Sequence, residues 1–156
     1  MKGLPMNTRR AFLGLLATIP VSGALVRPAM ASSPMVYQHE GVAINGYDPV
    51  AYFTDSAPVY GDDAYRLMWG GAIWRFATAE NLEAFEMNPS AYAPQYGGYC
   101  AYAVSRGAVA TTEPDAWTIH EGKLFLNYNL TVRGIWSQDI AGNVALADNN
   151  WPNVLA

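Results

Sequence analysis

The stretch Tyr65–Phe76, YRLMWGGAIWRF, predicts a β-hairpin from which the rest of the fold can be worked out. Gly70-Gly71 at its centre supplies the two positive φ angles that a tight two-residue turn needs. Side chains alternate between the faces of a strand, so this register gathers the larger apolar residues on one face. That face, which we expect to lie against the core, consists of Tyr65, Leu67, Trp69, Trp74 and Phe76.

The same register places Arg66 opposite Arg75 on the other face of the hairpin. Like charges in direct cross-strand pairs repel each other. Because the chain has 13 acidic residues, we expect a carboxylate to bridge the two guanidinium groups. A clamp for an anionic ligand is the alternative that this pair leaves open.

Residues Trp117–Tyr128 predict a second hairpin, which turns at Glu121-Gly122. On the outer face His120 pairs with Lys123, and a position beside the turn predicts an exposed imidazole. The inner face is expected to consist of Trp117, Ile119, Leu124 and Leu126.

Short helices are predicted between and after the hairpins. Asp48 precedes Pro49, and a capping carboxylate with proline at the first helical position is a good helix start. Thr78 is expected to cap a second helix, which ends before Pro89. A third helical pattern lies near the C-terminus, at Val132, Ile135 and Trp136.

The predicted fold class is α+β: a small single domain of β-hairpins packed against three or four short helices. Gly41–Ile44 is expected to add a short strand, and Asp148–Pro152 a polar tail that is docked by Trp151. No repeat or inner linker divides the chain. Residues 32–156 are therefore predicted to form one domain, large enough to bury a core without disulfides.

Residues 1–31 have the pattern of a cleaved export signal. Arg9-Arg10 is followed by Phe12-Leu13, as in a twin-arginine signal peptide, and then by an uncharged stretch that is short for a membrane span. Ala29-Met30-Ala31 offers a cleavage site between small residues. The sequence thus predicts a periplasmic protein with no stable membrane insertion after cleavage. A general secretory signal and an uncleaved anchor are the alternatives.

Charge restricts the partners of the mature domain. The predicted leader holds four of the nine basic side chains and none of the 13 acidic ones, which leaves five against 13 and a formal charge of −8. No cluster of lysines or arginines remains, so nucleic acid is not an expected partner. An acidic domain is better suited to a metal ion, another cationic ligand or a periplasmic protein of opposite charge.

Cys100 is the only cysteine of the chain, and it lies within Tyr96–Tyr102, YGGYCAY. Disulfides form in the compartment to which an exported protein is delivered. Because the chain has no second cysteine, Cys100 cannot form a disulfide within the chain. Three interpretations stay open: a buried and inert thiol, a metal or redox ligand, and a disulfide to another chain. A thiolate is the kind of ligand that Cu(I) and Zn(II) prefer.

Further metal ligands have to come from outside that stretch. In addition to Cys100, the candidate metal ligands are Asp48, His120 and His39, and the thioethers of Met68 and Met87 are further possible ligands. None of them stands at a spacing typical of metal ligands. Asp48 is equally explained as a helix cap, and a histidine beside a turn is usually a surface residue.

Tyrosines are numerous around the candidate residues and predict either a ligand pocket or a core. A core tyrosine usually directs its hydroxyl to a polar partner, so the two interpretations differ in what that hydroxyl contacts. The residues assigned to the pocket are Tyr47, Tyr52, Tyr99 and Tyr102.

Several motifs run through nearly the whole mature chain. They are GYDPVAY at 46–52, WGGAIWRFA at 69–77, NLEAF at 81–85, NPSAY at 88–92, YGGYCAYA at 96–103, KLFLNYN at 123–129 and DNNWP at 148–152. Their joint spacing resembles the YHS domain, in the exported bacterial branch of that family.

The resemblance implies a link to metals, copper first, since YHS domains accompany copper-transporting ATPases and resemble cysteine-bearing metal-sensing modules. In metal-binding relatives cysteines stand where this chain has Ala51, Ala77 and Leu82. None of these three side chains can bind a metal. A site in this chain would therefore have to be built around Cys100.

No enzyme motif is present: the chain has no nucleophile elbow, phosphate loop, dinucleotide fingerprint or zinc-protease helix. The leading hypothesis is a non-enzymatic periplasmic binding module that handles metal through Cys100. The second is an accessory or interaction protein in which Cys100 is part of the core. The third is an oxidoreductase-like enzyme that uses the thiol.

Overall fold

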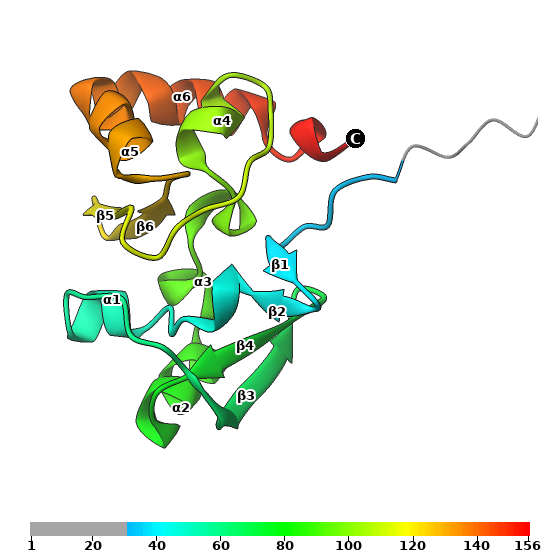
Figure 1. The fold of residues 1–156 in the computed structure, drawn as a ribbon, viewed down its shortest axis with the longest axis vertical. Coiled ribbons are helices and arrows are strands. Elements are labelled where there is room, and N and C mark those ends of the chain that lie inside the picture. Colours follow the sequence, from blue (N-terminus) through cyan, green and yellow to red (C-terminus); the bar gives the residue numbers. More distant parts are fainter. Residues whose placement is uncertain (1–30) are drawn as a thin grey trace, which may run out of the picture.

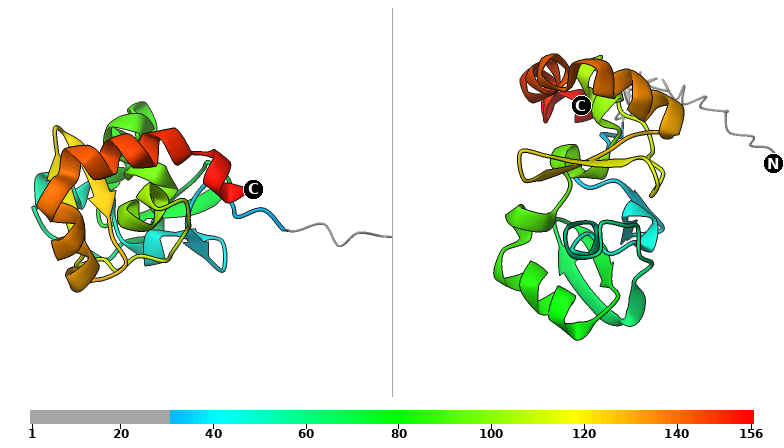
Figure 2. Two further views of the ribbon diagram at one scale, coloured as in Figure 1. Left: turned by 90° about the horizontal axis from the view of Figure 1, so that it is seen from above. Right: turned by 90° about the vertical axis from the view of Figure 1, so that its left-hand side faces the viewer.

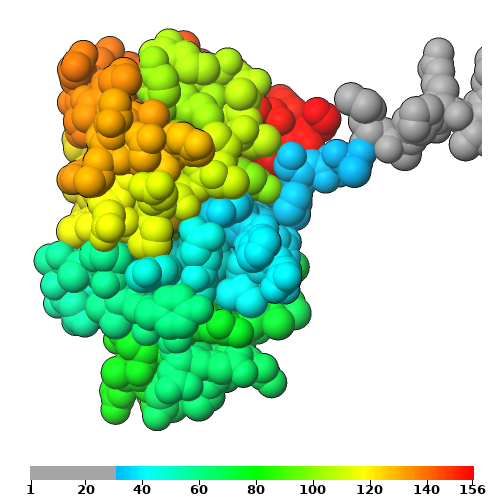
Figure 3. Space-filling view, in the orientation of Figure 1, coloured from blue at the N-terminus to red at the C-terminus, as the bar shows by residue number. Residues whose placement is uncertain are grey.

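The computed structural model describes residues 31–156, so the predicted leader lies outside the described residues except for Ala31. These residues form one body of two stacked parts (Figures 1 and 3). The lower part in Figure 1 holds a mixed sheet with α1 (Ala51–Thr54) and α2 (Ala79–Met87) beside it, and the upper part holds a hairpin covered by helices. The predicted α+β class is confirmed.

The sheet of the lower part has the strand order β1-β2-β4-β3. Strands β2 and β4 are parallel, and the other neighbours are antiparallel. The second sheet is the hairpin β5-β6. The strands are β1 (Gln38–His39), β2 (Val42–Ala43), β3 (Asp62–Trp69), β4 (Ala72–Phe76), β5 (Trp117–His120) and β6 (Lys123–Leu126).

Helices of one to three turns connect and cover these strands. The α-helices are α1 (Ala51–Thr54), α2 (Ala79–Met87), α3 (Pro89–Tyr92), α4 (Ala101–Ser105), α5 (Leu130–Trp136) and α6 (Ile140–Asn150). Short 3-10 helices are η1 (Ile44–Gly46), η2 (Gln95–Gly98), η3 (Ser137–Asp139) and η4 (Asn153–Leu155). Within residues 31–156, no helix has the length and apolar character needed to cross a bilayer.

The first hairpin has the predicted turn and register, with Trp69 opposite Ala72 and Leu67 opposite Trp74. Trp74 and Phe76 are buried as expected. Tyr65 is not, because it lies at the irregular end of an edge strand: pairing shifts between Asp62 and Arg66, and the ring stays 36% exposed. The prediction that Tyr65 belongs to the core face is therefore wrong.

Asp63 offsets the charge repulsion between Arg66 and Arg75, which the register places opposite each other. Its carboxylate lies 3.3 Å from a nitrogen of Arg66 and 3.1 Å from one of Arg75. The predicted acidic bridge is confirmed.

The second hairpin separates two hydrophobic cores (Figure 2, right). Leu124 and Leu126 lie in the lower core, while Phe125 points to the opposite face and lies in the upper core. The lower core contains Val36, Ala43, Ile44, Val50, Tyr52, Ala72, Trp74, Phe76, Phe85, Leu124 and Leu126. The upper core contains Tyr96, Tyr99, Ala101, Val104, Phe125, Trp136, Ala147 and Leu155.

Predicted helix caps are present. The Thr78 hydroxyl accepts a hydrogen bond from the Asn81 amide at 3.1 Å, and α2 ends at the predicted Asn88-Pro89 boundary. The predicted tail differs: Asp148, together with the two asparagines after it, forms the last turn of α6. Trp151 follows that helix and packs against the upper core, as expected.

The entering chain is bound along the side of both parts. The Ser33 amide donates to the Leu155 carbonyl at 2.9 Å, and the Tyr37 amide donates to the Gly97 carbonyl at 2.9 Å. Residues 33–37 therefore lie beside η2 and η4, next to the C-terminus, as Figure 1 shows. This contact creates one wall of the pocket described next.

Candidate functional site

A pocket of about 610 Å³ opens between the two parts of the molecule. This volume lies within the range of small-molecule sites, roughly 300–1,000 Å³. Segments distant in sequence meet there: the entering chain, the first hairpin, the α3–η2 connection and the residue after α6. The lining residues are Met35, Val36, Trp69, Gly70, Trp74, Ser90, Ala93, Pro94, Gln95, Tyr96, Gly97 and Trp151.

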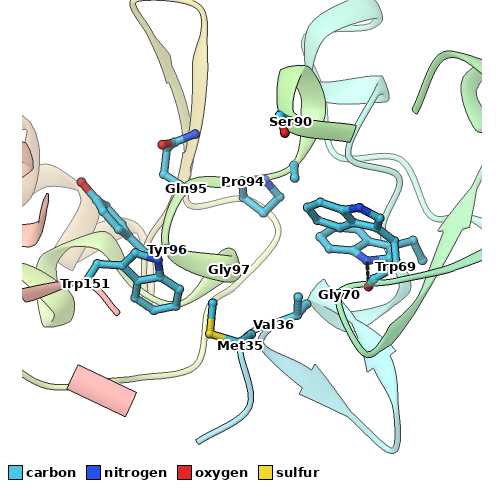
Figure 4. Close-up of a pocket in the computed structure, with 12 residues that line it drawn as sticks. Met35, Val36, Trp69, Gly70, Ser90, Pro94, Gln95, Tyr96, Gly97 and Trp151 are labelled. Atoms are coloured by element: carbon cyan, nitrogen blue, oxygen red, sulfur yellow. Dashed lines mark hydrogen bonds between the residues drawn. The ribbon is translucent and has the colours of Figure 1, made fainter. Parts of the chain in front are cut away.

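Aromatic rings form two facing walls of this pocket. Figure 4 shows Trp69 on one side, with Tyr96 and Trp151 on the other. Trp74 adds a second indole to the first wall, with ring centroids 5.8 Å from Trp69. The centroids of Tyr96 and Trp151 lie 6.1 Å apart in the second wall. Pro94 and Gln95 lie above the space in this view, and Met35 lies below it.

Hairpin geometry fixes the indole wall. The Trp74 indole N–H donates to the Trp69 carbonyl at 2.9 Å, so the two residues are held together across the turn. Phe85 of α2 packs edge-on against Trp69, with centroids 5.5 Å apart. The first wall is therefore held by contacts within the protein itself.

The opposite wall includes Tyr96, whose backbone is strained and whose side chain is held by a hydrogen bond. Tyr96 has φ 56° and ψ 37°, a left-handed conformation that costs a residue with a side chain roughly 1–2 kcal/mol. Its hydroxyl donates to an Asp148 carboxylate oxygen at 2.9 Å. Burial, and after it the bond to Asp148, raises the pKa of the Tyr96 hydroxyl well above its ordinary value. Strain of this kind gathers at ligand and catalytic sites.

The lining of the pocket is mainly aromatic and apolar. It contains no acidic or basic side chain and no cysteine or histidine, and its polar side chains are essentially Ser90 and Gln95. An apolar cavity with few polar groups is the usual form of a small-molecule site.

Cys100 lies away from this pocket and is 1% exposed. Its sulfur caps α4 by accepting the Ala103 amide at 3.5 Å, and it accepts the Tyr128 amide at 3.2 Å. The thiol in turn lies 3.6 Å from the Asn127 side-chain oxygen, to which it donates. The sulfur thus joins α4 to the chain that follows β6.

Asn127 is the partner of Cys100 that the sequence did not reveal. It is fully buried, and its side-chain oxygen also accepts the Tyr102 amide at 3.1 Å. Its side-chain nitrogen is buried without a hydrogen-bond partner in the described structure. The only signal in the sequence was a polar residue near the end of the predicted second hairpin.

We expect the Cys100 thiol of the folded protein to resist alkylation, because it is buried and already hydrogen-bonded. Ellman's reagent should react with it only at the rate of unfolding. In a variant that also carries Ala91→Cys on an exposed position of α3, one thiol should react at once and the second only in denaturant. Prompt reaction of both thiols in the native protein would contradict this assignment.

The four candidate metal ligands do not meet. Asp48 is buried in the lower part, where both carboxylate oxygens accept hydrogen bonds from the protein. His39 lies on β1 and is exposed, and His120 lies at the β5–β6 turn, 3.8 Å from Glu121. Across residues 31–156, no three histidine, cysteine or acidic side chains are grouped as metal ligands. The residues around Cys100 therefore do not fit a copper or zinc site, and metal binding stays a prediction.

Two of the four tyrosines assigned to a ligand pocket have structural partners in the lower part. Tyr52 is 1% exposed, and its hydroxyl donates to the Pro114 carbonyl at 3.0 Å. Burial, followed by the nearby Tyr47 and two carboxylates, raises the pKa of the Tyr52 hydroxyl. Tyr47 packs edge-on against Tyr60.

The other two tyrosines lie in the upper part. The Tyr99 hydroxyl donates to the Pro34 carbonyl at 2.9 Å, and burial raises its pKa. The Arg106 guanidinium lies 4.9 Å from the centre of the Tyr102 ring. None of the four predicted tyrosines lines the aromatic pocket; Tyr96 does.

Comparison of the chain with protein-family models, with curated proteins and with solved structures finds no match, so its resemblance to the YHS domain stays a prediction.

Proposed function

We propose that this protein is a non-enzymatic binding module that holds a small, largely apolar molecule in the pocket between its two parts. The observation that carries the proposal is the pair of aromatic walls around a cavity of about 610 Å³. Aromatic rings supply large contact areas, and roughly 25 cal/mol is gained for each Å² of apolar surface that leaves water.

Strain in the free protein supports a binding role. Tyr96 has an unfavourable backbone conformation, and in this conformation its ring forms part of the pocket wall. A wall that is formed beforehand spares the ligand the cost of ordering it. The lining has no acidic, basic, cysteine or histidine side chain, so its Ser90 hydroxyl has no neighbouring base in the lining to activate it, which favours binding over catalysis.

The second hypothesis from the sequence, an accessory protein with Cys100 in its core, agrees with this proposal. Burial of the thiol at 1% exposure disfavours both direct metal handling and a thiol-dependent oxidoreductase. The twin-arginine pattern at Arg9-Arg10 supports a periplasmic location. The domain would then meet its ligand after export.

Filling the pocket should weaken ligand binding and leave the fold intact. Ser90 lines the pocket from an exposed position on α3, so Ser90→Trp places an indole in the cavity. Binding of N-phenyl-1-naphthylamine, a neutral dye that fluoresces in apolar sites, should weaken at least about tenfold, or about 1.4 kcal/mol.

Ala91→Trp is the matched control, because Ala91 is an exposed neighbour that does not line the pocket. It should bind the dye as the wild-type protein does. Equal affinity in wild type and both variants would place the dye elsewhere and contradict the proposal, as would absence of dye binding to the wild type.

A further inference from the structure

The charges of the side chains around the aromatic pocket favour one class of ligand over another. This inference rests on the proposed function. No positively charged side chain lines the cavity. In residues 31–156 there are 13 acidic and five basic side chains, so the surrounding field attracts cations. The basic residues, all outside the lining, are Arg66, Arg75, Arg106, Lys123 and Arg133.

Several of these basic groups are committed elsewhere. Asp63 pairs with both arginines of the first hairpin. Arg106 lies over Tyr102 and donates to Asn143 at 3.0 Å, and Arg133 donates to Thr118 at 2.9 Å. An anionic ligand would therefore enter the pocket without a charged partner. Burying an unpaired charge in an apolar site is strongly unfavourable for either sign, and the lining has no acidic side chain for a cation either. Only a cation can recover part of that cost from the faces of aromatic rings.

The faces of aromatic rings, in contrast, attract cations. A cation within about 6 Å of a ring centre gains free energy from the negative face, most of all over tryptophan. The pocket presents the rings of Trp69, Tyr96 and Trp151 from two opposite sides (Figure 4). Quaternary ammonium groups suit such walls, because their methyl groups need no hydrogen-bond acceptors.

Tyr96 adds a specific feature to the second wall. Its hydroxyl points away from the cavity and donates to Asp148 at 2.9 Å. A phenol that donates to a carboxylate becomes richer in electrons, and its ring face becomes more negative. Asp148 thus acts on the pocket through the ring without lining it.

We infer that the pocket binds a small organic cation, a quaternary ammonium group attached to an apolar body. The cationic head lies against Tyr96 and Trp151, and the apolar body lies along the indole wall. Ser90 and Gln95 at the rim offer the hydrogen bonds for one further polar group.

Choline and 3,3-dimethylbutan-1-ol test the inference directly, because they have the same shape and differ only in charge. Each competes with N-phenyl-1-naphthylamine in the wild-type protein, and calorimetry measures the direct affinity. Choline should bind about tenfold more tightly than its neutral analogue, as expected for a cation on aromatic faces. Equal or tighter binding of the alcohol would overturn the inference.

Asp148→Asn isolates the contribution of the carboxylate. Asp148 is exposed, so the replacement leaves the core unchanged. Affinity for choline should fall about threefold, on the order of a modest cation–π contribution, and affinity for the neutral alcohol should not change. An equal change for both probes would contradict the effect that we assign to the Tyr96–Asp148 bond.

Two variants separate pocket binding from attraction to the acidic surface. Ser90→Trp should abolish choline binding, whereas Ala91→Trp should retain it, also at high salt, where exposed charges are screened. If the dye binds and choline does not, the inference fails while the proposed function stands. If neither binds, both fail.

Discussion

Replacement of Asp48 by alanine should destabilise the protein by about 3–5 kcal/mol, because several N–H donors would lose their acceptor and each buried donor left unsatisfied costs about 1–3 kcal/mol. Asp48 has no exposed surface. One carboxylate oxygen accepts the amides of Val50 and Ala51, at 2.8 and 3.3 Å. The other accepts the Ala77 amide at 2.8 Å and the Asn81 side chain at 2.7 Å.

Alanine would leave four donors without their acceptor in the lower part of the molecule. Such a loss is a large fraction of a total stability of roughly 5–15 kcal/mol. Urea unfolding followed by tryptophan fluorescence measures it. Asp48→Asn should also be damaging, because the new amide group turns a donor toward either the Ala77 or the Val50 amide.

Thr78→Ala is the matched control for Asp48, since both residues hold the start of α2. Thr78 caps the helix through the Asn81 amide, at 3.1 Å, in an exposed setting. Loss of such a cap costs about 1 kcal/mol. An Asp48→Ala variant as stable as Thr78→Ala would show that the buried carboxylate does not join the sheet to α1 and α2.

Asp48 also shows where prediction from sequence ends. The sequence predicted that Asp48 caps a helix with Pro49 as its first residue. The Asp48 carboxylate does accept the Val50 and Ala51 amides, which is a local interaction, but α1 begins at Ala51, two residues later than predicted. The bonds to Ala77 and Asn81 join residues about thirty positions apart. Only the packed sheet brings them together.

The two hairpins were predictable for the same reason. Positive-φ glycines and alternating apolar residues specify turn and register within a dozen residues. Tyr65 was the exception, because alternation says nothing about what covers the end of an edge strand. The burial of Phe125 was not predicted. Apart from this ring, the outer face of the second hairpin has polar side chains, which predict exposure to solvent, whereas in the structure both faces of the hairpin are covered.

The candidate pocket could not be predicted, although most of its aromatic residues were noticed. Trp69 and Trp74 were expected in a core, and Trp151 as an anchor of the tail. What makes them a site is the space between the entering chain at Met35, the first hairpin and the residue after α6. Sequence patterns report which residues avoid water and do not show where packing leaves a cavity.

Gly97→Ala should be the second strongly destabilising replacement, by about 3 kcal/mol, from strain of about 1–2 kcal/mol and overpacking of a similar size. Gly97 has φ +62°, which a residue with a side chain adopts at a cost. A methyl group there would collide with the Met35 carbonyl oxygen and lie 3.3 Å from the Val36 Cα. Because these are backbone atoms, no side-chain rotation can relieve the contact.

Gly107→Ala separates strain from collision. Gly107 has a similar φ of +77°, but a methyl group there meets nothing within 4 Å, so strain alone should cost about 1–2 kcal/mol. Gly97→Ala should in addition displace Met35 and weaken dye binding, because both residues line the pocket. Gly107→Ala should bind the dye normally. Equal stability and equal dye affinity in the two variants would mean that the entering chain is not held against η2 and does not shape the pocket.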